Sequence, residues 1–399
     1  MRSVVLDLRL SGRDQPGERR KRSSRPKGGP VAGTQPIPVE KGIVTLVESD
    51  KPDVLTGEVR LAVEACSLCG SDYSACHLDP SGKPVFSGPL KSPVILGHEL
   101  AGTVESVGAG VTRVRVGDLV AVESVLSCWS CDTCLSGYPA QCERGELLGM
   151  TRNGGLADYV SVPERACFPL ESLLRDGLPR NEAAVTGALI EPMGAAYSAL
   201  CLSDRGVIPG DSLVVYGLGG LGMLLGSLAR IAGCYPIIGV DRDESRVKWA
   251  VTRWFDDGIA VDTGSTEAGA AAAEIGRRLG RIGADIQIDV SGSTDTVMPI
   301  AQRLLAPGGR LVVMSRTRNT VPTEVNPWVS SAASIQGLRG RVDARAYPRV
   351  IALFSGGRLS ARDHVTRFVP LEAVPAILMN GGEPQPGKTM VMVAAEAPW

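Results

Sequence analysis

Two patterns of apolar and polar positions divide this chain of 399 residues. Between about residues 41 and 160 the two kinds of residue alternate in short runs separated by glycines. This alternation predicts half-buried β-strands, at 41–47, 58–63, 101–107, 118–122 and 154–160. After residue 191, short apolar runs alternate with helical stretches, among them the alanine-rich segment 267–279. Such alternation predicts a doubly wound parallel sheet, with strands at 212–216, 236–240, 259–262, 284–290, 310–314 and 334–336. We therefore expect an α/β protein of two domains.

A glycine-rich turn follows the first strand of the predicted parallel sheet. It has the spacing Gly-x-Gly-x-x-Gly, and an apolar helix is expected to begin at Leu221. In a dinucleotide-binding fold the three glycines allow the tight turn, the approach of backbone to the pyrophosphate, and close helix–strand packing. The helix N-terminus then holds the phosphates with its free N–H groups. The segment predicted to bind the cofactor comprises Gly217, Leu218, Gly219, Gly220, Leu221 and Gly222.

The second strand of this sheet ends at Asp241, 19 residues after Gly222. A carboxylate at this position accepts hydrogen bonds from the adenosine ribose and repels a 2′-phosphate, so NAD is favoured over NADP. Arg242 and Arg246 follow closely, and their positive charges keep NADP as an alternative cofactor. In that case Arg242 would contact the 2′-phosphate.

Four cysteines lie within a short stretch with the spacing C-x2-C-x2-C-x7-C. Thiolates at this spacing converge on one point and complete a closed tetrahedral Zn²⁺ shell, which leaves no position for a substrate. Disulfides are disfavoured, because cysteines so close in sequence form strained bridges. A structural zinc site is therefore predicted at Cys128, Cys131, Cys134 and Cys142.

This spacing resembles the structural zinc lobe of zinc-dependent medium-chain alcohol and polyol dehydrogenases. Two further motifs resemble the catalytic zinc site of that family, Cys-Gly-Ser-Asp at 69–72 and Gly-His-Glu at 97–99. The resemblance implies Cys69 and His98 as ligands of a second Zn²⁺, with Cys66 a core residue. Glu191, which precedes a proline, matches the third ligand of the polyol branch. Glu99 is left open as a ligand or as a contact of a metal-bound water.

The resemblance also implies roles for the neighbouring residues. Ser71 is placed to accept the proton of the substrate hydroxyl and pass it to the nicotinamide ribose, and Asp72 is expected to orient His98. Many relatives carry a histidine three residues after Ser71, where this chain has Ser74. The last step of the proton path is therefore assigned to solvent or to His77. His364 is expected to be structural.

The resemblance covers about residues 41–399 and implies the domain organisation. A GroES-like β-rich catalytic domain is expected over 41–190, with the zinc lobe at 128–142. A Rossmann domain follows over 191–337, and residues 338–399 are expected to return to the catalytic domain with a final strand at 387–393. Residues 1–40 begin with a stretch rich in Arg, Lys, Gly, Pro and Ser, which favours a disordered basic extension.

The implied function is hydride transfer between NAD and a secondary alcohol, polyol or cyclitol, with two Zn²⁺ per chain. The proline- and glycine-rich segment 73–93, expected to be a long loop, resembles that of butanediol- and polyol-type enzymes. Two alternatives remain, a zinc-dependent NADPH reductase of carbonyl compounds and a zinc-stapled binding protein without activity.

Composition agrees with a cytoplasmic enzyme. The net charge is −1, which gives no reason to expect a nucleic-acid or membrane partner. No apolar run is long enough to span a membrane, and no signal peptide is expected. We expect a small-molecule alcohol or ketone as the substrate and a homodimer or homotetramer as the assembly.

Overall fold

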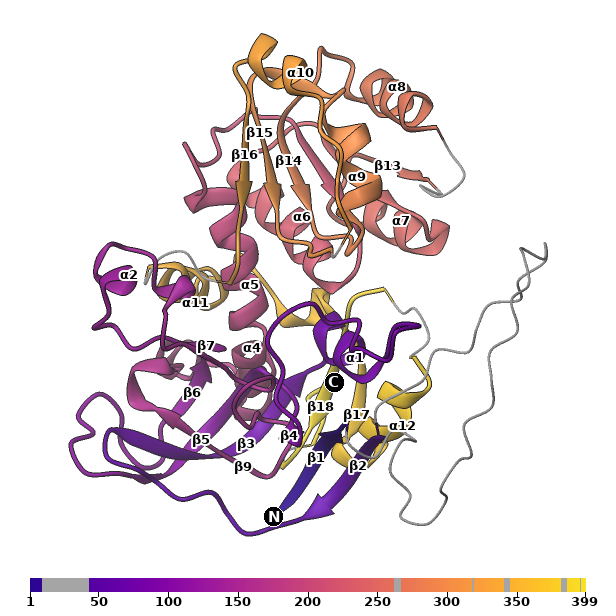
Figure 1. Cartoon of the computed structure of the whole chain (residues 1–399). Coiled ribbons are helices and arrows are strands. Elements are labelled where there is room, and N and C mark those ends of the chain that lie inside the picture. Colours follow the sequence, from indigo (N-terminus) through magenta and orange to yellow (C-terminus); the bar gives the residue numbers. More distant parts are fainter. Residues whose placement is uncertain (9–42, 262–266, 318, 341–344, 382–385, 395) are drawn as a thin grey trace, which may run out of the picture.

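The computed structural model describes residues 1–8, 43–261, 267–317, 319–340, 345–381, 386–394 and 396–399. The chain folds into a β-rich domain, which contains both termini, and an α/β domain above it in Figure 1. Bent helices connect the two, and a cleft lies between them.

The core of the β-rich domain is a seven-stranded sheet in which β3 pairs with both β5 and β9. Alternation along β3 explains its place, because Val59, Leu61 and Val63 all point into the core with no exposure. The strands are β3 (Glu58–Ser67), β5 (Glu99–Val107), β6 (Leu119–Val122), β9 (Tyr159–Pro163), β10 (Cys167–Pro169), β17 (Val365–Pro370) and β18 (Lys388–Met392). The last two bring the C-terminal segment into this sheet, where β18 pairs with β3.

The first residues of the chain form a strand, which differs from the expectation of disorder over 1–40. β1 (Arg2–Asp7) pairs antiparallel with β2 (Ile43–Glu48) and with β4 (Val94–Ile95). Val4 and Leu6 are fully buried, and this burial is enough to order the strand. The basic composition of the following stretch hid this short alternation. That stretch, residues 9–42, lies outside the described residues.

The α/β domain contains a parallel sheet in the order β13-β12-β11-β14-β15-β16, visible in the upper half of Figure 1. Its strands are β11 (Leu213–Tyr216), β12 (Ile237–Asp241), β13 (Asp257–Ala260), β14 (Ala284–Asp289), β15 (Leu305–Val313) and β16 (Ser334–Gly337). Each coincides with or overlaps a predicted strand. The accompanying helices are α6 (Gly220–Ala232), α7 (Glu244–Val251), α8 (Ala268–Leu279), α9 (Thr294–Ala301) and α10 (Val325–Ser330).

The remaining elements are short and lie mainly around the β-rich domain and the connection. They are α1 (Gly70–Cys76), α2 (Asp132–Leu135), α3 (Glu171–Arg175), α4 (Arg180–Ala188), α5 (Ile190–Tyr197), α11 (Ala346–Ser355), α12 (Val374–Met379), β7 (Val125–Leu126), β8 (Glu146–Leu147), the 3₁₀ turns η1 (Pro139–Gln141), η2 (Glu164–Ala166), η4 (Ala361–Asp363) and η5 (Leu371–Ala373), and the π-helical η3 (Ser198–Leu202). Helix α1 occupies the start of the segment 73–93 that was expected to be a loop.

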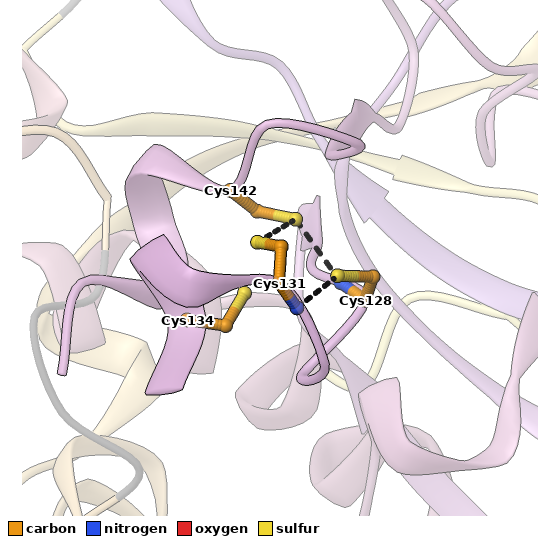
Figure 2. Close-up of side chains that lie close together, drawn as sticks. All are labelled: Cys128, Cys131, Cys134 and Cys142. Atoms are coloured by element: carbon orange, nitrogen blue, oxygen red, sulfur yellow. Dashed lines mark hydrogen bonds between the residues drawn. The ribbon is translucent and has the colours of Figure 1, made fainter. Parts of the chain in front are cut away.

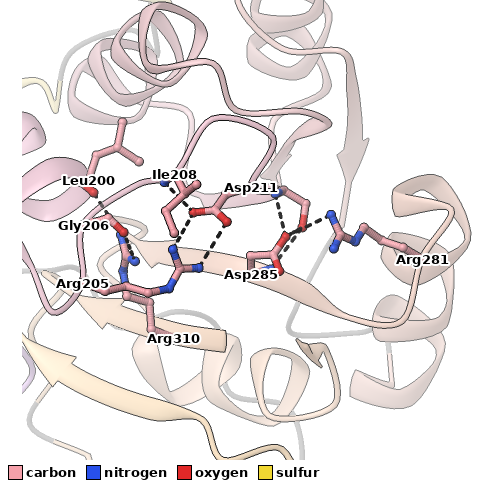
Figure 3. Close-up of polar contacts among 9 residues, drawn as sticks. Leu200, Arg205, Gly206, Ile208, Asp211, Arg281, Asp285 and Arg310 are labelled. Carbon is pink, nitrogen blue, oxygen red and sulfur yellow. Dashed lines mark hydrogen bonds and ion pairs between the residues drawn. The ribbon is translucent and has the colours of Figure 1, made fainter. Parts of the chain in front are cut away.

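A buried arginine anchors the connecting helices to the parallel sheet (Figure 3). Arg310 of β15 is 1% exposed and donates hydrogen bonds to the carbonyls of Leu200 (2.9 Å) and Gly206. Beside it, the Arg205 guanidinium pairs with Asp211 at 3.0 Å. These bonds satisfy carbonyls at the end of the helical connection. The end of η3 is therefore fixed to the nucleotide-binding sheet, while α5 carries Glu191 toward the cleft.

No single described helix is both long and apolar enough to cross a membrane, although the bent pair formed by α4 with α5 and η3 meets the criterion in length and composition.

Candidate functional site

The cleft between the domains has a volume of about 820 Å³ and is lined from both sides. The β-rich domain contributes Cys69, Ser71, His98 and Glu99, and the connecting helix contributes Glu191. The parallel sheet contributes the turn Gly219–Gly222 at the start of α6. Residues that lie far apart in sequence, which were predicted to bind a metal and a dinucleotide, therefore share one cavity.

Three of the predicted metal-site residues converge closely. Cys69 immediately precedes α1, His98 immediately precedes β5, and Glu99 begins β5. Their ligand atoms all lie within 4.8 Å of one another. Thiolate, imidazole and carboxylate groups at this separation suit Zn²⁺.

His98 is held between two polar side chains. Its Nδ1 lies 3.7 Å from Asp72 Oδ1, and its Nε2 lies 3.3 Å from Ser71 Oγ. Asp72 is fully buried and its other oxygen accepts the Cys69 N–H at 2.9 Å. Burial raises the pKa of Asp72 despite the opposing effect of His98. This arrangement suits an aspartate that orients the imidazole while Nε2 faces the metal position and Ser71.

Glu191 lies in the first turn of α5 and faces the same cavity, outside the tight group of three. The Ser124 hydroxyl donates a hydrogen bond to Glu191 Oε1. Burial raises the pKa of Glu191. A bound cation would offset that cost, so this carboxylate fits a metal ligand.

Lys388 is a site residue that the sequence reasoning missed. It lies in β18, is 5% exposed, and places Nζ 2.8 and 2.6 Å from the two oxygens of Glu99. Burial lowers its pKa, but Glu99 and Cys69 outweigh burial, so the net pKa is raised. Its stem also touches the glycine turn, since a Cβ on Gly220 would lie 2.3 Å from Lys388 Cδ. No local signal marks it, because Lys388 begins the strand β18 and its partner Glu99 lies 289 residues away.

The glycine turn has the geometry that each of its three glycines was predicted to need. Gly217 has φ +96°, and a Cβ there would lie 2.7 Å from Ser291 Cα. A Cβ on Gly222 would lie 1.9 Å from the Gly217 carbonyl oxygen. Apart from its chain neighbours, no described residue has a heavy atom within 4 Å of the Cβ position of Gly219, so the backbone there borders open space. A pyrophosphate fits this space at the N-terminus of α6.

Asp241 ends β12 and is 9% exposed. Its carboxylate accepts the N–H groups of Leu218 at 2.6 Å and Asp243 at 2.9 Å, which ties it to the glycine turn. Arg246 Nη1 lies 3.9 Å away. Both Arg242 and Arg246 line the cleft, so the adenosine end carries one carboxylate and two guanidinium groups.

The four clustered cysteines surround one point in the lobe between β7 and β8 (Figure 2). Their sulfur atoms all lie within 4.8 Å of one another. Cys128 Sγ accepts the N–H groups of Ser130 and Cys131, and the Ser130 interaction lowers the Cys128 pKa to about 5. N–H groups that point at sulfur stabilise the thiolate form that a metal requires. The donor set is complete without an outside ligand, as in a structural zinc site.

The residues considered for the last proton step lie away from the cleft lining. Ser74 Oγ donates to the Ser71 carbonyl at 3.1 Å, and His77 Nδ1 lies 2.6 Å from the Tyr73 carbonyl. His364 is 1% exposed and stacks on Trp254, and burial lowers its pKa to about 4. These contacts suit a structural role for His364.

A donor set for catalytic zinc that faces a dinucleotide-binding turn defines a nicotinamide-dependent zinc oxidoreductase. Comparison with known families agrees, because residues 56–172 match the alcohol dehydrogenase GroES-like domain and residues 220–356 match the zinc-binding dehydrogenase family. The chain therefore belongs to the zinc-binding alcohol and polyol dehydrogenases. The predicted fold class and the expectation of an enzyme that uses zinc and a nicotinamide cofactor are confirmed.

Three relatives are similar over most of their length. The probable D-xylulose reductase A of Aspergillus clavatus is 30% identical over 79% of this chain and 84% of its own. The scyllo-inosose 3-dehydrogenase of Thermotoga maritima is 27% identical over 80% of this chain and 81% of its own. The crystal structure of 2R,3R-butanediol dehydrogenase from Bacillus subtilis is 26% identical, with a TM-score of 0.70 over 88% of this chain and 96% of that one.

Proposed function

We propose that this protein transfers a hydride between NAD and a secondary alcohol, a polyol or a cyclitol. The observation that carries the proposal is the single cleft in which Cys69, His98 and Glu191 face the glycine turn of the nucleotide-binding domain. Relatives named for a pentulose, an inosose and a butanediol support this range of substrates.

Cys69, His98 and Glu191 would hold the catalytic zinc, and Glu99 would be held by Lys388 beside them. Bound zinc supplies a Lewis acid that lowers the pKa of an alcohol and polarises a carbonyl. Asp72 orients the imidazole of His98. Ser71, which borders both His98 and the cleft, would act as a relay: its oxygen accepts the proton of the substrate hydroxyl while its own hydroxyl proton passes to the nicotinamide ribose and from there to solvent. Lys388 offsets the charge of Glu99 and packs against the phosphate-binding turn.

The test is NADH formation by the zinc-loaded protein with a panel of diols, polyols and cyclitols, followed by absorbance. Metal analysis should give two zinc ions per chain, and a chelator that removes one of them should stop turnover until zinc is restored. Failure of the two-zinc protein to oxidise any alcohol or to reduce any matching ketone would overturn the proposal.

We expect kcat/KM to be at least about tenfold higher with NAD than with NADP, which requires only about 1.4 kcal/mol. Asp241, fixed by the N–H groups of Leu218 and Asp243, would repel a 2′-phosphate. Asp241→Asn should lower the ratio of kcat/KM with NAD to kcat/KM with NADP. The control Asp257→Asn, on the neighbouring strand β13, should leave this ratio unchanged. Equal kcat/KM with the two cofactors would instead assign Arg242 to the 2′-phosphate and favour an NADPH reductase.

A homodimer or homotetramer is the proposed assembly, with two chains joined by edge-to-edge pairing of β16. This strand is the outer strand of the parallel sheet, and exposed apolar side chains of Ile335, Val325 and Val329 lie on it and on the nearby α10. An unpaired edge of this kind accepts a second strand, and a two-fold axis would bring two copies together. Light scattering that gives the mass of one chain would exclude this interface.

A cytoplasmic location is also proposed. All ten cysteines lie in the described part of the chain, and none forms a disulfide. Two zinc sites built from free thiols suit a reducing compartment.

A further inference from the structure

Two arginines line the cleft in addition to those near Asp241. Arg316 lies beyond the end of β15, and Arg339 lies beyond the end of β16. The sequence gives no local sign of a site at either position, because arginine is mostly exposed in folded proteins. Their convergence becomes visible only in the fold, where β15 and β16 are adjacent and parallel.

The order of the strands separates these arginines from the cofactor phosphates. A dinucleotide crosses the carboxyl ends of such a sheet, with its pyrophosphate at the helix that follows β11. Its adenosine half lies toward β12, so its nicotinamide half and the substrate lie toward β14 and β15. Strands are about 4.8 Å apart, which places β15 and β16 roughly 10 and 14 Å from β11. Arg316 and Arg339 therefore stand at the substrate end.

These two guanidinium groups have no carboxylate partner among the described residues. No ion pair or hydrogen bond of either side chain is present in that part of the structure, whereas Arg246 has Asp241 and Asp243 as neighbours. The two acidic residues that line the cleft are engaged elsewhere, Glu99 with Lys388 and Glu191 with Ser124.

The local electrostatics favour an anion at this position. Arg339 is partly buried, and both burial and the nearby charge of Arg316 lower its pKa. Arg316 is exposed, so the electrostatic cost falls on the partly buried Arg339, whose charge a bound anion would stabilise. Guanidinium groups bind phosphate and carboxylate groups through paired hydrogen bonds.

We propose that Arg316 and Arg339 bind an anionic group of the alcohol substrate, a phosphate monoester or a carboxylate. This inference rests on the proposed dehydrogenase function and narrows its substrate class. The hydroxyl to be oxidised lies at the zinc end, between Ser71 and the nicotinamide, and the anionic group lies against the two arginines. Among the alcohols, polyols and cyclitols of the proposed function, the preferred substrates are therefore those that carry such an anionic group.

The experiment compares pairs of substrates that differ in the anionic group. Suitable pairs are sorbitol with sorbitol 6-phosphate, myo-inositol with an inositol monophosphate, and 2-butanol with 3-hydroxybutyrate, so that phosphate and carboxylate are tested separately. Each is assayed with the zinc-loaded full chain and with Arg316→Gln, Arg339→Gln and Arg316→Lys. Arg358→Gln, at an exposed position outside the cleft lining, is the matched control.

We expect the anionic member of at least one pair to have the higher kcat/KM, by about tenfold or more. Each glutamine variant should lower that value by about 10- to 100-fold, mainly through KM, since a charge-assisted hydrogen bond is lost. The neutral member should change by less than about twofold, Arg316→Lys should restore part of the loss, and Arg358→Gln should match the wild type. NADH affinity, measured by fluorescence, should stay within about twofold.

Three results would overturn the inference. Neutral alcohols used as well as their charged counterparts would remove the need for an anion site. Equal losses for neutral and charged substrates would make the arginines structural, and weaker NADH binding would assign them to the cofactor. If no alcohol is oxidised, the proposed function fails by itself. The anion site is then judged by calorimetric binding of inorganic phosphate to the protein saturated with NAD, which occupies the glycine turn. The double glutamine variant should abolish this binding, and equal phosphate binding by the variant and the wild type would overturn the inference.

Discussion

Replacing Ser71 with alanine is expected to lower kcat by about 10²- to 10⁴-fold, the range over which general acid–base assistance acts. The Ser71 hydroxyl lies 3.3 Å from His98 Nε2 and borders the cleft, so it is the side chain best placed to take the substrate proton. The substitution removes one oxygen and leaves the metal ligands and the glycine turn in place. The measurement is steady-state kcat from about pH 6 to pH 10, with zinc content and NAD affinity checked alongside.

Two neighbouring substitutions serve as controls for this proton path. Ser74→Ala removes a hydroxyl that already donates to the Ser71 carbonyl, and it should change kcat far less. His77→Ala should also cost little, because His77 does not line the cleft. Wild-type turnover in Ser71→Ala would rule out this role for the serine. A large loss in His77→Ala would instead make His77 the exit for the proton.

The sequence predicted most of the architecture because its signals are local. The central strands β11 and β12 are short apolar runs buried along their whole length, and β11 to β16 lie at or overlap the predicted positions. The glycine turn could be predicted for a similar reason, since the positions of Gly217 and Gly222 leave no room for a Cβ. Cysteine spacing predicted the convergence of the four thiols, because a tetrahedral shell restricts the number of residues between ligands.

Other features were not predicted, because they depend on contacts between residues far apart in sequence or on a short pattern beside a stretch of different composition. The alternation of Val4 and Leu6 spans only a few positions, and the basic stretch after them dominated the composition. Lys388 lies 289 residues from Glu99, and nothing local announces that contact. The neighbouring positions of Arg316 and Arg339 depend on the strand order β14-β15-β16. Such contacts require the topology as well as the pattern.

Lys388 bears on the choice between Glu191, the third zinc ligand that the resemblance implies, and Glu99, which the sequence left open. Glu99 directly follows the ligand His98, and its oxygen lies in the group of three close donors. Both of its oxygens, however, lie within 2.8 Å of Lys388 Nζ. A carboxylate shared with a buried ammonium group is a weaker metal ligand, because the two cations compete for the same oxygens. Glu191 has no ion pair with a cationic side chain among the described residues, and the charges of His98 and Lys388 act on it only from a greater distance. Glu191 is therefore the proposed ligand.

Cys131→Ser is expected to cost about 4 kcal/mol or more in the free energy of unfolding and to lower the zinc content from two ions per chain to one. Loss of a structural metal belongs to the few changes with effects of this size. Cys131 Sγ lies 3.8 Å from Cys142 Sγ, and all four sulfurs surround one point. With three ligands left, the lobe between β7 and β8 would lose the metal that closes it.

The consequences should be confined to stability and to the lobe. Metal analysis measures the loss of zinc, and denaturant unfolding measures the loss of stability. In limited proteolysis, the protease should cleave the variant near residues 128–142. Folded protein at low temperature should keep most of its kcat, because none of the four cysteines lines the cleft. Cys201→Ser, at a partly buried cysteine outside both donor sets, should retain two zinc ions and near-normal stability. A Cys131→Ser protein of normal stability that has lost turnover would contradict a structural role, since it would place this metal in the chemistry.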